Sequence, residues 1–269
     1  MTDIEREAIR RTKLFLFDLD GTLYLGNRLF DFTEELLDTI KASGKRYMFM
    51  TNNSSKGIGS YIEKMASLGI GTDKDDYITS SQATSHYISE KYPDKHFYVC
   101  GTRSFYDELA SSGVSVCDDI LKSDAIVMGF DTELTFKKLD DVCSLLCKKD
   151  VPYIASHPDM VCPTEYGSVP DCGSVCDMVY NATGKRPDAV IGKPGILMPK
   201  LAMEKCGVLP SECAVVGDRL YTDVLCGINA KAYAVLVLSG ETTPKILEGS
   251  NIKPDAVFKS AGEIIDALK

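Results

Sequence analysis

Long apolar runs are missing from this sequence. The longest, residues 232–238, is far shorter than the about 20 residues that a membrane-spanning helix needs. Residues 1–7 are rich in charge and lack the apolar stretch of a secretory signal. We therefore expect a cytoplasmic protein with no targeting segment and no membrane partner.

Positive charge is also in short supply. Lysine and arginine number 30 against 39 aspartate and glutamate residues, which gives a net charge of −9. Nucleic-acid backbones attract basic surfaces, so this balance argues against a nucleic-acid partner. A small phosphorylated ligand is still compatible with it, because a bound divalent cation reverses the charge of its surroundings.

Several familiar binding motifs are absent. Gly57-x-Gly59 begins like a dinucleotide-binding loop, but Ile62 stands where the third glycine would be, and there is no Walker loop. The ten cysteines form no C-x-x-C pair and the three histidines are scattered, so we expect no zinc site. Because we expect no secretion, we interpret the cysteines as free thiols in a reducing compartment.

The sequence does have a pair of acids at the end of an apolar run. Residues 14–17 predict a buried strand, and residues 18–22 (Asp-Leu-Asp-Gly-Thr) follow it. Asp18 and Asp20 lie two positions apart, so on an extended backbone their side chains point the same way. An ionised aspartate can attack phosphorus, and a second acid can protonate the departing alcohol. The alternative is an ordinary strand followed by an acidic turn.

Three further polar segments each follow an apolar, strand-like run: residues 51–53 after 47–50, residues 192–194 after 188–191, and residues 217–223 after 213–216. Open parallel sheets bind ligands beyond the carboxyl ends of their strands, so the four segments can converge on one site. Together they offer acids for a metal, a hydroxyl and amides for phosphate oxygens, and a lysine for phosphate charge.

With these four motifs in this order, the sequence resembles the haloacid dehalogenase superfamily of phosphohydrolases. The resemblance implies that Asp18 is the nucleophile and a metal ligand. It implies that Asp20 is the general acid and base, with its backbone carbonyl also on the metal. It further implies that Asp218 coordinates the metal directly and that Asp223 lies near the metal and the lysine. The implied cofactor is Mg²⁺, which suits oxygen ligands and phosphoryl transfer.

The resemblance also implies a phosphate-binding set. Thr51 and Asn52, followed by Asn53, match the segment that holds the transferring phosphoryl group. Lys193 matches the lysine that balances the charges of nucleophile and phosphate. Taken singly, residues 51–53 are also a common turn composition, and a lone lysine is most often a solvated loop residue.

Strand-like runs alternate with helical stretches along the chain, as in a parallel α/β fold. We expect a Rossmann-like catalytic core of residues 1–80 and 185–269, interrupted by an α/β cap of residues 81–184. In the cap we expect strands near 97–100, 125–128 and 153–155, and helices near 105–110, 136–148 and 175–183.

In the core we expect helices over residues 33–42, about 59–68, 199–206, 222–230 and 260–268. The core sheet is expected to resume at residue 188. Lys231 stands where relatives usually have glycine after the preceding helix, which suggests an altered helix end.

The size and place of the cap resemble the NagD-like branch of the superfamily, the nitrophenylphosphatases and nucleotide monophosphatases. Residues 155–159 and 170–173 resemble that branch's substrate-facing loops. We therefore expect His157 and Asp171 to approach the leaving group. The alternative is that both lie in surface turns.

These expectations combine into a magnesium-dependent phosphomonoester hydrolase that acts through an aspartyl phosphate. The expected partners are small phosphorylated metabolites, with nucleoside monophosphates or sugar phosphates favoured. Two alternatives stay open: a non-catalytic phosphate-binding regulatory module, and a phosphotransferase or mutase on the same core. The sequence gives no indication of the oligomeric state.

Overall fold

Two parallel sheets organise the chain in the computed structural model, which describes residues 1–164 and 166–269. Contacts group the described residues into two compact units. The first unit is Met1–Thr51, Ile62–Ile78 and Lys193–Lys269, and the second unit is Asn52–Tyr61 and Thr79–Gly192. The core and cap boundaries at residues 81 and 184 stay a prediction.

The first unit contains a six-stranded sheet in the order β15-β14-β13-β1-β4-β5. Its strands are β1 (Leu14–Phe17), β4 (Arg46–Thr51), β5 (Tyr77–Thr79), β13 (Cys213–Gly217), β14 (Tyr233–Val237) and β15 (Ala256–Phe258). Strand β1 is fully buried, which its run of apolar side chains requires, and it pairs in parallel with β4 and β13. In this register Phe17 lies opposite Phe49 and Val216, so the carboxyl ends of the three strands are neighbours.

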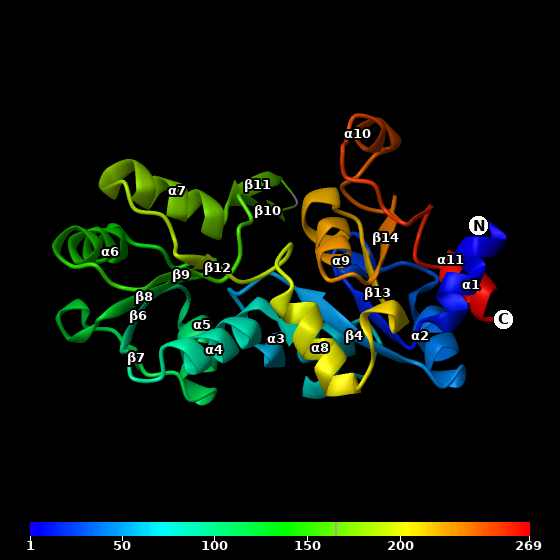
Figure 1. The fold of residues 1–269 in the computed structure, drawn as a ribbon, viewed down its shortest axis with the longest axis horizontal. Coiled ribbons are helices and arrows are strands. Elements are labelled where there is room, and N and C mark those ends of the chain that lie inside the picture. Colours follow the sequence, from blue (N-terminus) through cyan, green and yellow to red (C-terminus); the bar gives the residue numbers. More distant parts are fainter. Residues whose placement is uncertain (165) are drawn as a thin grey trace. The chain divides into compact units, whose positions relative to one another are not determined.

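Helices flank this sheet, and α1 and α11 bring the two ends of the chain side by side (Figure 1). The unit contains α1 (Asp3–Arg11), α2 (Thr33–Ala42), α8 (Leu197–Cys206), α9 (Leu225–Asn229), α10 (Pro244–Glu248) and α11 (Glu263–Leu268). It also has the hairpin β2 (Tyr24–Leu25) and β3 (Arg28–Leu29), a π-helical turn at Leu220–Val224, and 3₁₀ turns at Lys74–Asp76 and Pro210–Glu212. The predicted helix over residues 33–42 is confirmed, with Leu36, Leu37 and Ile40 on its buried face.

The second unit contains a five-stranded parallel sheet in the order β12-β9-β8-β6-β7. Its strands are β6 (Phe97–Cys100), β7 (Val116–Cys117), β8 (Ala125–Met128), β9 (Tyr153–Ala155) and β12 (Ala189–Val190). Helices α6 (Phe136–Lys148) and α7 (Cys172–Thr183) lie on one face of the sheet, and α4 (Ser80–Lys91) and α5 (Arg103–Ser111) lie on the other (Figure 1). The hairpin β10 (Val161–Thr164) and β11 (Gly167–Pro170) precedes α7, and a 3₁₀ turn spans Ile120–Lys122. Helix α3 (Ile58–Ser67) contributes residues to both units.

One sequence expectation about the elements is wrong, and another is right only in part. The run 188–191 does not rejoin the first sheet: its two-residue strand β12 pairs with β9 in the second sheet, and Asp188 exchanges hydrogen bonds with the backbone of Tyr153. The expected helix 222–230 is present, but its first part belongs to the π-helical turn and only α9 is α-helical. There, the N–H groups of Asp223 and Val224 both donate to the carbonyl of Arg219.

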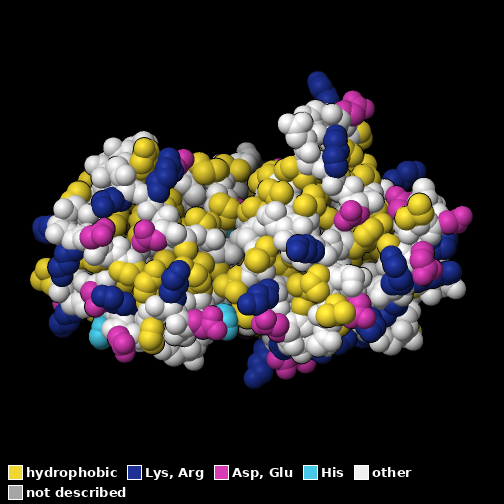
Figure 2. All heavy atoms as spheres, in the orientation of Figure 1, with side chains coloured by type: hydrophobic (Ala, Val, Ile, Leu, Met, Phe, Trp, Pro, Cys, Tyr) yellow, Lys and Arg dark blue, Asp and Glu magenta, His cyan; other side chains and the backbone are white. Residues whose placement is uncertain are grey.

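Acidic and basic side chains are interspersed on the face of the molecule drawn in Figure 2. Within the described part of the chain, no helix has both the length and the apolar character that crossing a membrane would require.

Candidate active site

Lys193 joins two of the predicted acids in the first unit. Its Nζ donates hydrogen bonds to Asp18 Oδ1 and Asp223 Oδ1, each at 2.6 Å, and to the carbonyl oxygen of Met50 at 3.1 Å. The lysine and Asp223 side chains are almost fully buried, and that of Asp18 is 17% exposed. Charge-assisted hydrogen bonds of this length fix the orientation of the Asp18 carboxylate at the end of β1.

The Asp223 carboxylate reaches the lysine because of the π-helical turn. Its second oxygen, Oδ2, accepts the N–H of Arg219 at 3.1 Å, which holds the side chain against the start of its own turn. A Cβ on Gly217 would collide with this carboxylate. The glycine at the end of β13 therefore leaves the space that Asp223 occupies.

Asp218 is the third acid, and one of its oxygens has no hydrogen-bond partner. Oδ2 accepts the N–H of Glu241 at 2.6 Å, whereas the buried Oδ1 has no partner among the described residues. A Cβ on Gly21 or Gly240 would collide with the Asp218 carboxylate. Gly21 also has φ of +80°, which an L side chain rarely adopts. The loop after β1 thus needs glycine both for its turn and for its approach to Asp218.

The three acids are electrostatically crowded. One carboxylate oxygen from each of Asp18, Asp218 and Asp223 lies within 4.8 Å of the others. Desolvation raises the pKa of Asp18 to about 6, with Lys193 opposing the rise and Asp223 adding to it. Desolvation, together with the charges of Asp18 and Asp223, raises the pKa of Asp218 to about 8. Burial acts to lower the pKa of Lys193, but the two carboxylates beside it outweigh this effect and raise that pKa.

This crowding fits a divalent cation. A buried carboxylate oxygen without a donor is costly, and the Lys193 ammonium balances only one of the three negative charges. Three carboxylate oxygens are a donor set that Mg²⁺ accepts. Asp18, Asp218 and Asp223 can therefore hold the ion, and a metal contact from the backbone carbonyl of Asp20 stays a prediction.

Asp20 stands apart from this buried cluster. It is exposed, and its backbone bridges to Tyr24, whose carbonyl accepts the N–H of Gly21 at 2.8 Å. Partial desolvation raises the pKa of the Asp20 carboxyl, opposed by the charge of Lys64. An accessible carboxyl with a raised pKa is suited to holding a proton for a leaving group.

The predicted phosphate-binding segment begins where β4 ends. Thr51 is the last residue of β4 and is buried. Asn52 and Asn53 begin the second unit. The side-chain carbonyl of Asn53 accepts the N–H and the hydroxyl of Ser55, at 2.9 and 2.7 Å, and so shapes the loop locally. Phosphate binding by these three residues stays a prediction.

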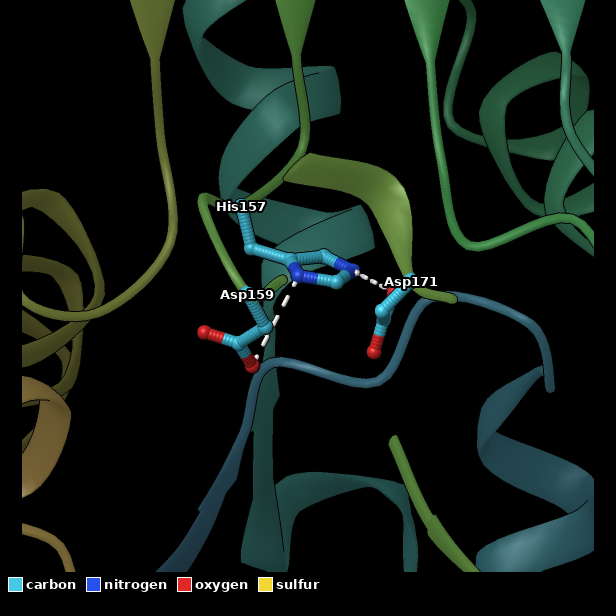
Figure 3. A group of neighbouring side chains, drawn as sticks. All are labelled: His157, Asp159 and Asp171. Atoms are coloured by element: carbon cyan, nitrogen blue, oxygen red, sulfur yellow. Dashed lines mark ion pairs between the residues drawn. The ribbon is translucent and has the colours of Figure 1, made fainter. Parts of the chain in front are cut away.

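The structure brings His157 and Asp171 together in the second unit. His157 Nε2 lies 3.6 Å from Asp171 Oδ1, and His157 Nδ1 lies 3.6 Å from Asp159 Oδ2, so the imidazole stands between two carboxylates (Figure 3). All three residues are buried, and Asp171 also accepts the N–H of Cys172 at the start of α7. The alternative of surface turns is wrong. Contact with the leaving group stays a prediction.

Comparison with known proteins now identifies the family. A protein-family model described as haloacid dehalogenase-like hydrolase matches residues 15–115, and a second family model, described as HAD-hydrolase-like, matches residues 190–264. The acid sugar phosphatase of Staphylococcus aureus is 31% identical over 261 residues, covering 97% of this chain and 100% of that protein. The chain belongs to the haloacid dehalogenase-like hydrolase family.

Solved structures of this hydrolase family share both units. The 4-nitrophenylphosphatase of Thermotoga maritima superposes with a TM-score of 0.93 at 39% identity, covering 97% of this chain and 99% of that one. NagD from Escherichia coli K-12 gives a TM-score of 0.84 at 25% identity, covering 94% and 98%. These likenesses confirm the prediction of a phosphatase of the NagD-like branch, with a parallel α/β core and an inserted α/β cap.

Two buried residues of the second unit were not among the predicted site residues of this haloacid dehalogenase-like hydrolase. Asp159 accepts a hydrogen bond from the side chain of Asn52, and the Ser54 hydroxyl lies 3.3 Å from His157 Nε2. Asp159 is two residues from His157, so an acid beside the singled-out histidine was an available signal. Ser54 carried no such signal, because serine is common in loops.

Proposed function

We propose that this chain is a magnesium-dependent phosphomonoester hydrolase that acts on small phosphorylated metabolites through an aspartyl phosphate on Asp18. The observation that carries the proposal is the Lys193 arrangement. A buried lysine holds one oxygen of Asp18, while the unpartnered oxygen of Asp218 lies in the same acidic cluster. A phosphate-binding module without catalysis has no need of such an oriented nucleophile.

The residues divide the reaction into two proton-coupled steps. Asp18 attacks phosphorus, and Asp20 donates its proton to the departing alcohol oxygen as the P–O bond breaks. Asp20, now ionised, takes a proton from water as the water attacks the aspartyl phosphate and releases phosphate and Asp18. One residue serves as acid and then as base because the second step reverses the proton transfer of the first.

Lys193 and the cation have separate electrostatic tasks. Lys193 keeps the Asp18 carboxylate ionised and aimed, since a raised lysine pKa keeps the ammonium charged. Asp18, Asp218 and Asp223 would hold Mg²⁺, which when bound would supply charge for the phosphoryl oxygens.

The names of the relatives support small substrates. The Staphylococcus aureus relative is an acid sugar phosphatase, and the Thermotoga maritima relative is a 4-nitrophenylphosphatase. We therefore favour sugar phosphates and nucleoside monophosphates, with choice among them residing in the second unit. We also place the enzyme in the cytoplasm, which the ten free cysteines support.

A phosphomonoester panel tests this function. Purified protein with Mg²⁺ should release inorganic phosphate from 4-nitrophenyl phosphate and from at least one sugar phosphate or nucleoside monophosphate. If only inorganic phosphate forms when an alcohol is added, and no new phosphate ester, the reaction is hydrolysis and not phosphotransfer. Absence of phosphate release from the whole panel would contradict the proposal.

A further inference from the structure

The side-chain amide of Asn52 is held from two sides within the second unit. Its Nδ2 donates to Asp159 Oδ1 at 3.0 Å. A Cβ on Gly192 would lie 2.5 Å from its Oδ1 and 2.8 Å from the Cβ of His157, so only glycine allows this packing. The backbone carbonyl of Asn52 accepts the hydroxyl of Ser80 at 2.6 Å. These contacts leave the Asn52 side chain little conformational freedom.

A buried chain of polar groups continues from this amide. Asp159 Oδ2 faces His157 Nδ1, and His157 Nε2 faces both Asp171 Oδ1 and the hydroxyl of Ser54. Ser54 in turn accepts the N–H of Phe130 at 2.8 Å. We call Asn52, Ser54, His157, Asp159 and Asp171 the Asn52 network; each of the three charged or titratable members is at most 8% exposed.

The Asn52 network lies where the chain passes between the two units. Asn52 is the first residue of the second unit after Thr51, and Gly192 is its last residue before Lys193. Thr51 and Lys193 carry the predicted phosphate contact and the ammonium that orients Asp18. The Asn52 network therefore contacts both chain neighbours of these groups: Asn52, which follows Thr51, and Gly192, which precedes Lys193.

We propose that Asp159 and His157 are positioning residues that fix Asn52 against Gly192 and so hold Thr51 and Lys193 in register for phosphoryl transfer. This role rests on the proposed phosphatase function. Buried hydrogen bonds are costly to break, so the bonds from Asn52 to Asp159 and from Phe130 to Ser54 hold the network in place. His157 Nδ1 has no hydrogen-bond partner among the described residues, and the imidazole is held by packing and by the two carboxylates beside it. A small misplacement of catalytic groups is enough to lower turnover about 100-fold.

The same contacts argue against a role in selecting substrate. A residue that selects substrate has to present a free polar group, whereas the His157 side chain is 0% exposed. Positioning accounts for this burial and for the hydrogen bond between the Asn52 amide and Asp159 Oδ1.

Asp159→Ala and Asp159→Asn form the decisive pair. Alanine removes the acceptor for Asn52, so kcat should fall about 10- to 100-fold on 4-nitrophenyl phosphate and on a sugar phosphate alike. Inhibition by inorganic phosphate should weaken in parallel. Asparagine keeps a carbonyl acceptor and should restore most of the activity. His157→Ala should lower kcat on both substrates by the same factor.

Asp141→Asn is the matched control. Asp141 is a buried carboxylate of the same unit that accepts Tyr98 Oη at 2.9 Å, outside the Asn52 network, so kcat should stay at the wild-type value. Thermal denaturation reports whether each variant is folded. Wild-type kcat for folded Asp159→Ala would overturn the proposal, as would a His157→Ala variant that changes only the ranking of substrates. An inactive wild-type protein would instead contradict the phosphatase function itself.

Discussion

At the scale of single residues, the Asp18 carboxylate is the group whose chemistry is most narrowly defined. Its Oδ1 is held by Lys193, and burial raises its pKa to about 6, which leaves the carboxylate mostly ionised at pH 7. Asp18→Asn is nearly isosteric but removes the nucleophile. We expect turnover to fall about a thousandfold or more while the protein stays folded. Phosphate release by a clean preparation measures this. A variant with a tenth of wild-type activity would exclude Asp18 as the nucleophile.

Asp218 makes the stability of the metal-free protein depend on pH. Its pKa is about 8 in the folded chain against 3.8 for an ordinary aspartate, so between about pH 4 and pH 8 the folded state binds a proton that the unfolded state lacks. Stability should therefore fall as the pH rises through this window. Asp18, with a pKa of about 6, adds to the lower part of it.

Asp218→Asn should flatten this pH dependence. In EDTA, the midpoint of thermal unfolding of the wild type should drop between pH 6 and pH 8 more than that of the variant. Mg²⁺ should stabilise the wild type more at pH 8 than at pH 6, because the ion displaces the proton. Equal slopes for the two proteins would show that Asp218 does not titrate in this range.

Residue identity at the site was predictable from the sequence to the extent that chemistry demands particular side chains. Asp18 and Asp20 stood out as paired acids at the end of a strand, and the family resemblance assigned Lys193 its role; the structure brings Asp18 and Lys193 within hydrogen-bonding distance. The hydrogen bond from the Asn52 amide to Asp159 was not predictable from the sequence. These residues are 107 positions apart, and no periodicity links them.

At the scale of secondary-structure elements, the end of α9 carries local strain. Lys231 has φ of +57°, and it is the one non-glycine residue with positive φ in the described ranges 1–164 and 166–269. The Lys231 N–H donates to the carbonyl of Ile228 and the Ala232 N–H to that of Gly227, so the helix ends in the motif that favours glycine. The altered helix end suggested by the sequence is thus a lysine in the glycine conformation.

Lys231→Gly should relieve this strain. A left-handed conformation costs a side-chain-bearing residue about 1 kcal/mol, and glycine's greater freedom in the unfolded chain offsets part of that gain. The thermal midpoint should rise by about 1 to 3 °C. Lys231→Ala, which keeps the Cβ, should leave it unchanged. A lower midpoint for the glycine variant would mean that the lysine side chain itself stabilises this helix end.

Element type was predictable where apolar patterns are long, and failed where elements are short. Helix α6 spans the predicted residues 136–148, because a 13-residue amphipathic pattern has one reasonable interpretation. Strand β12 has two residues, and its partner β9 is set by hydrogen bonds between Asp188 and Tyr153 that no local pattern encodes. The π-helical turn is likewise tied to long-range contacts, because its Asp223 side chain bonds to Lys193, which no local pattern encodes.

At the scale of the whole molecule, negative charge dominates. The chain carries a net charge of −9, and its buried acidic cluster would repel a phosphorylated substrate. Two parallel sheets could be predicted from the alternation of strands and helices. The proposed cation has no sequence pattern of its own, and it is inferred only from the acids that would surround it.

Divalent metal should therefore be essential, and its identity should matter. Exhaustive EDTA treatment should abolish phosphate release, and Mg²⁺ should restore it. Ca²⁺ should support little activity, because its longer and more numerous bonds can draw both Asp18 oxygens onto the ion and leave none for attack. Ca²⁺ should still raise the thermal midpoint, since it neutralises the same carboxylates. Full activity after EDTA would remove the metal assignment, and with it the role of Asp218 as a ligand.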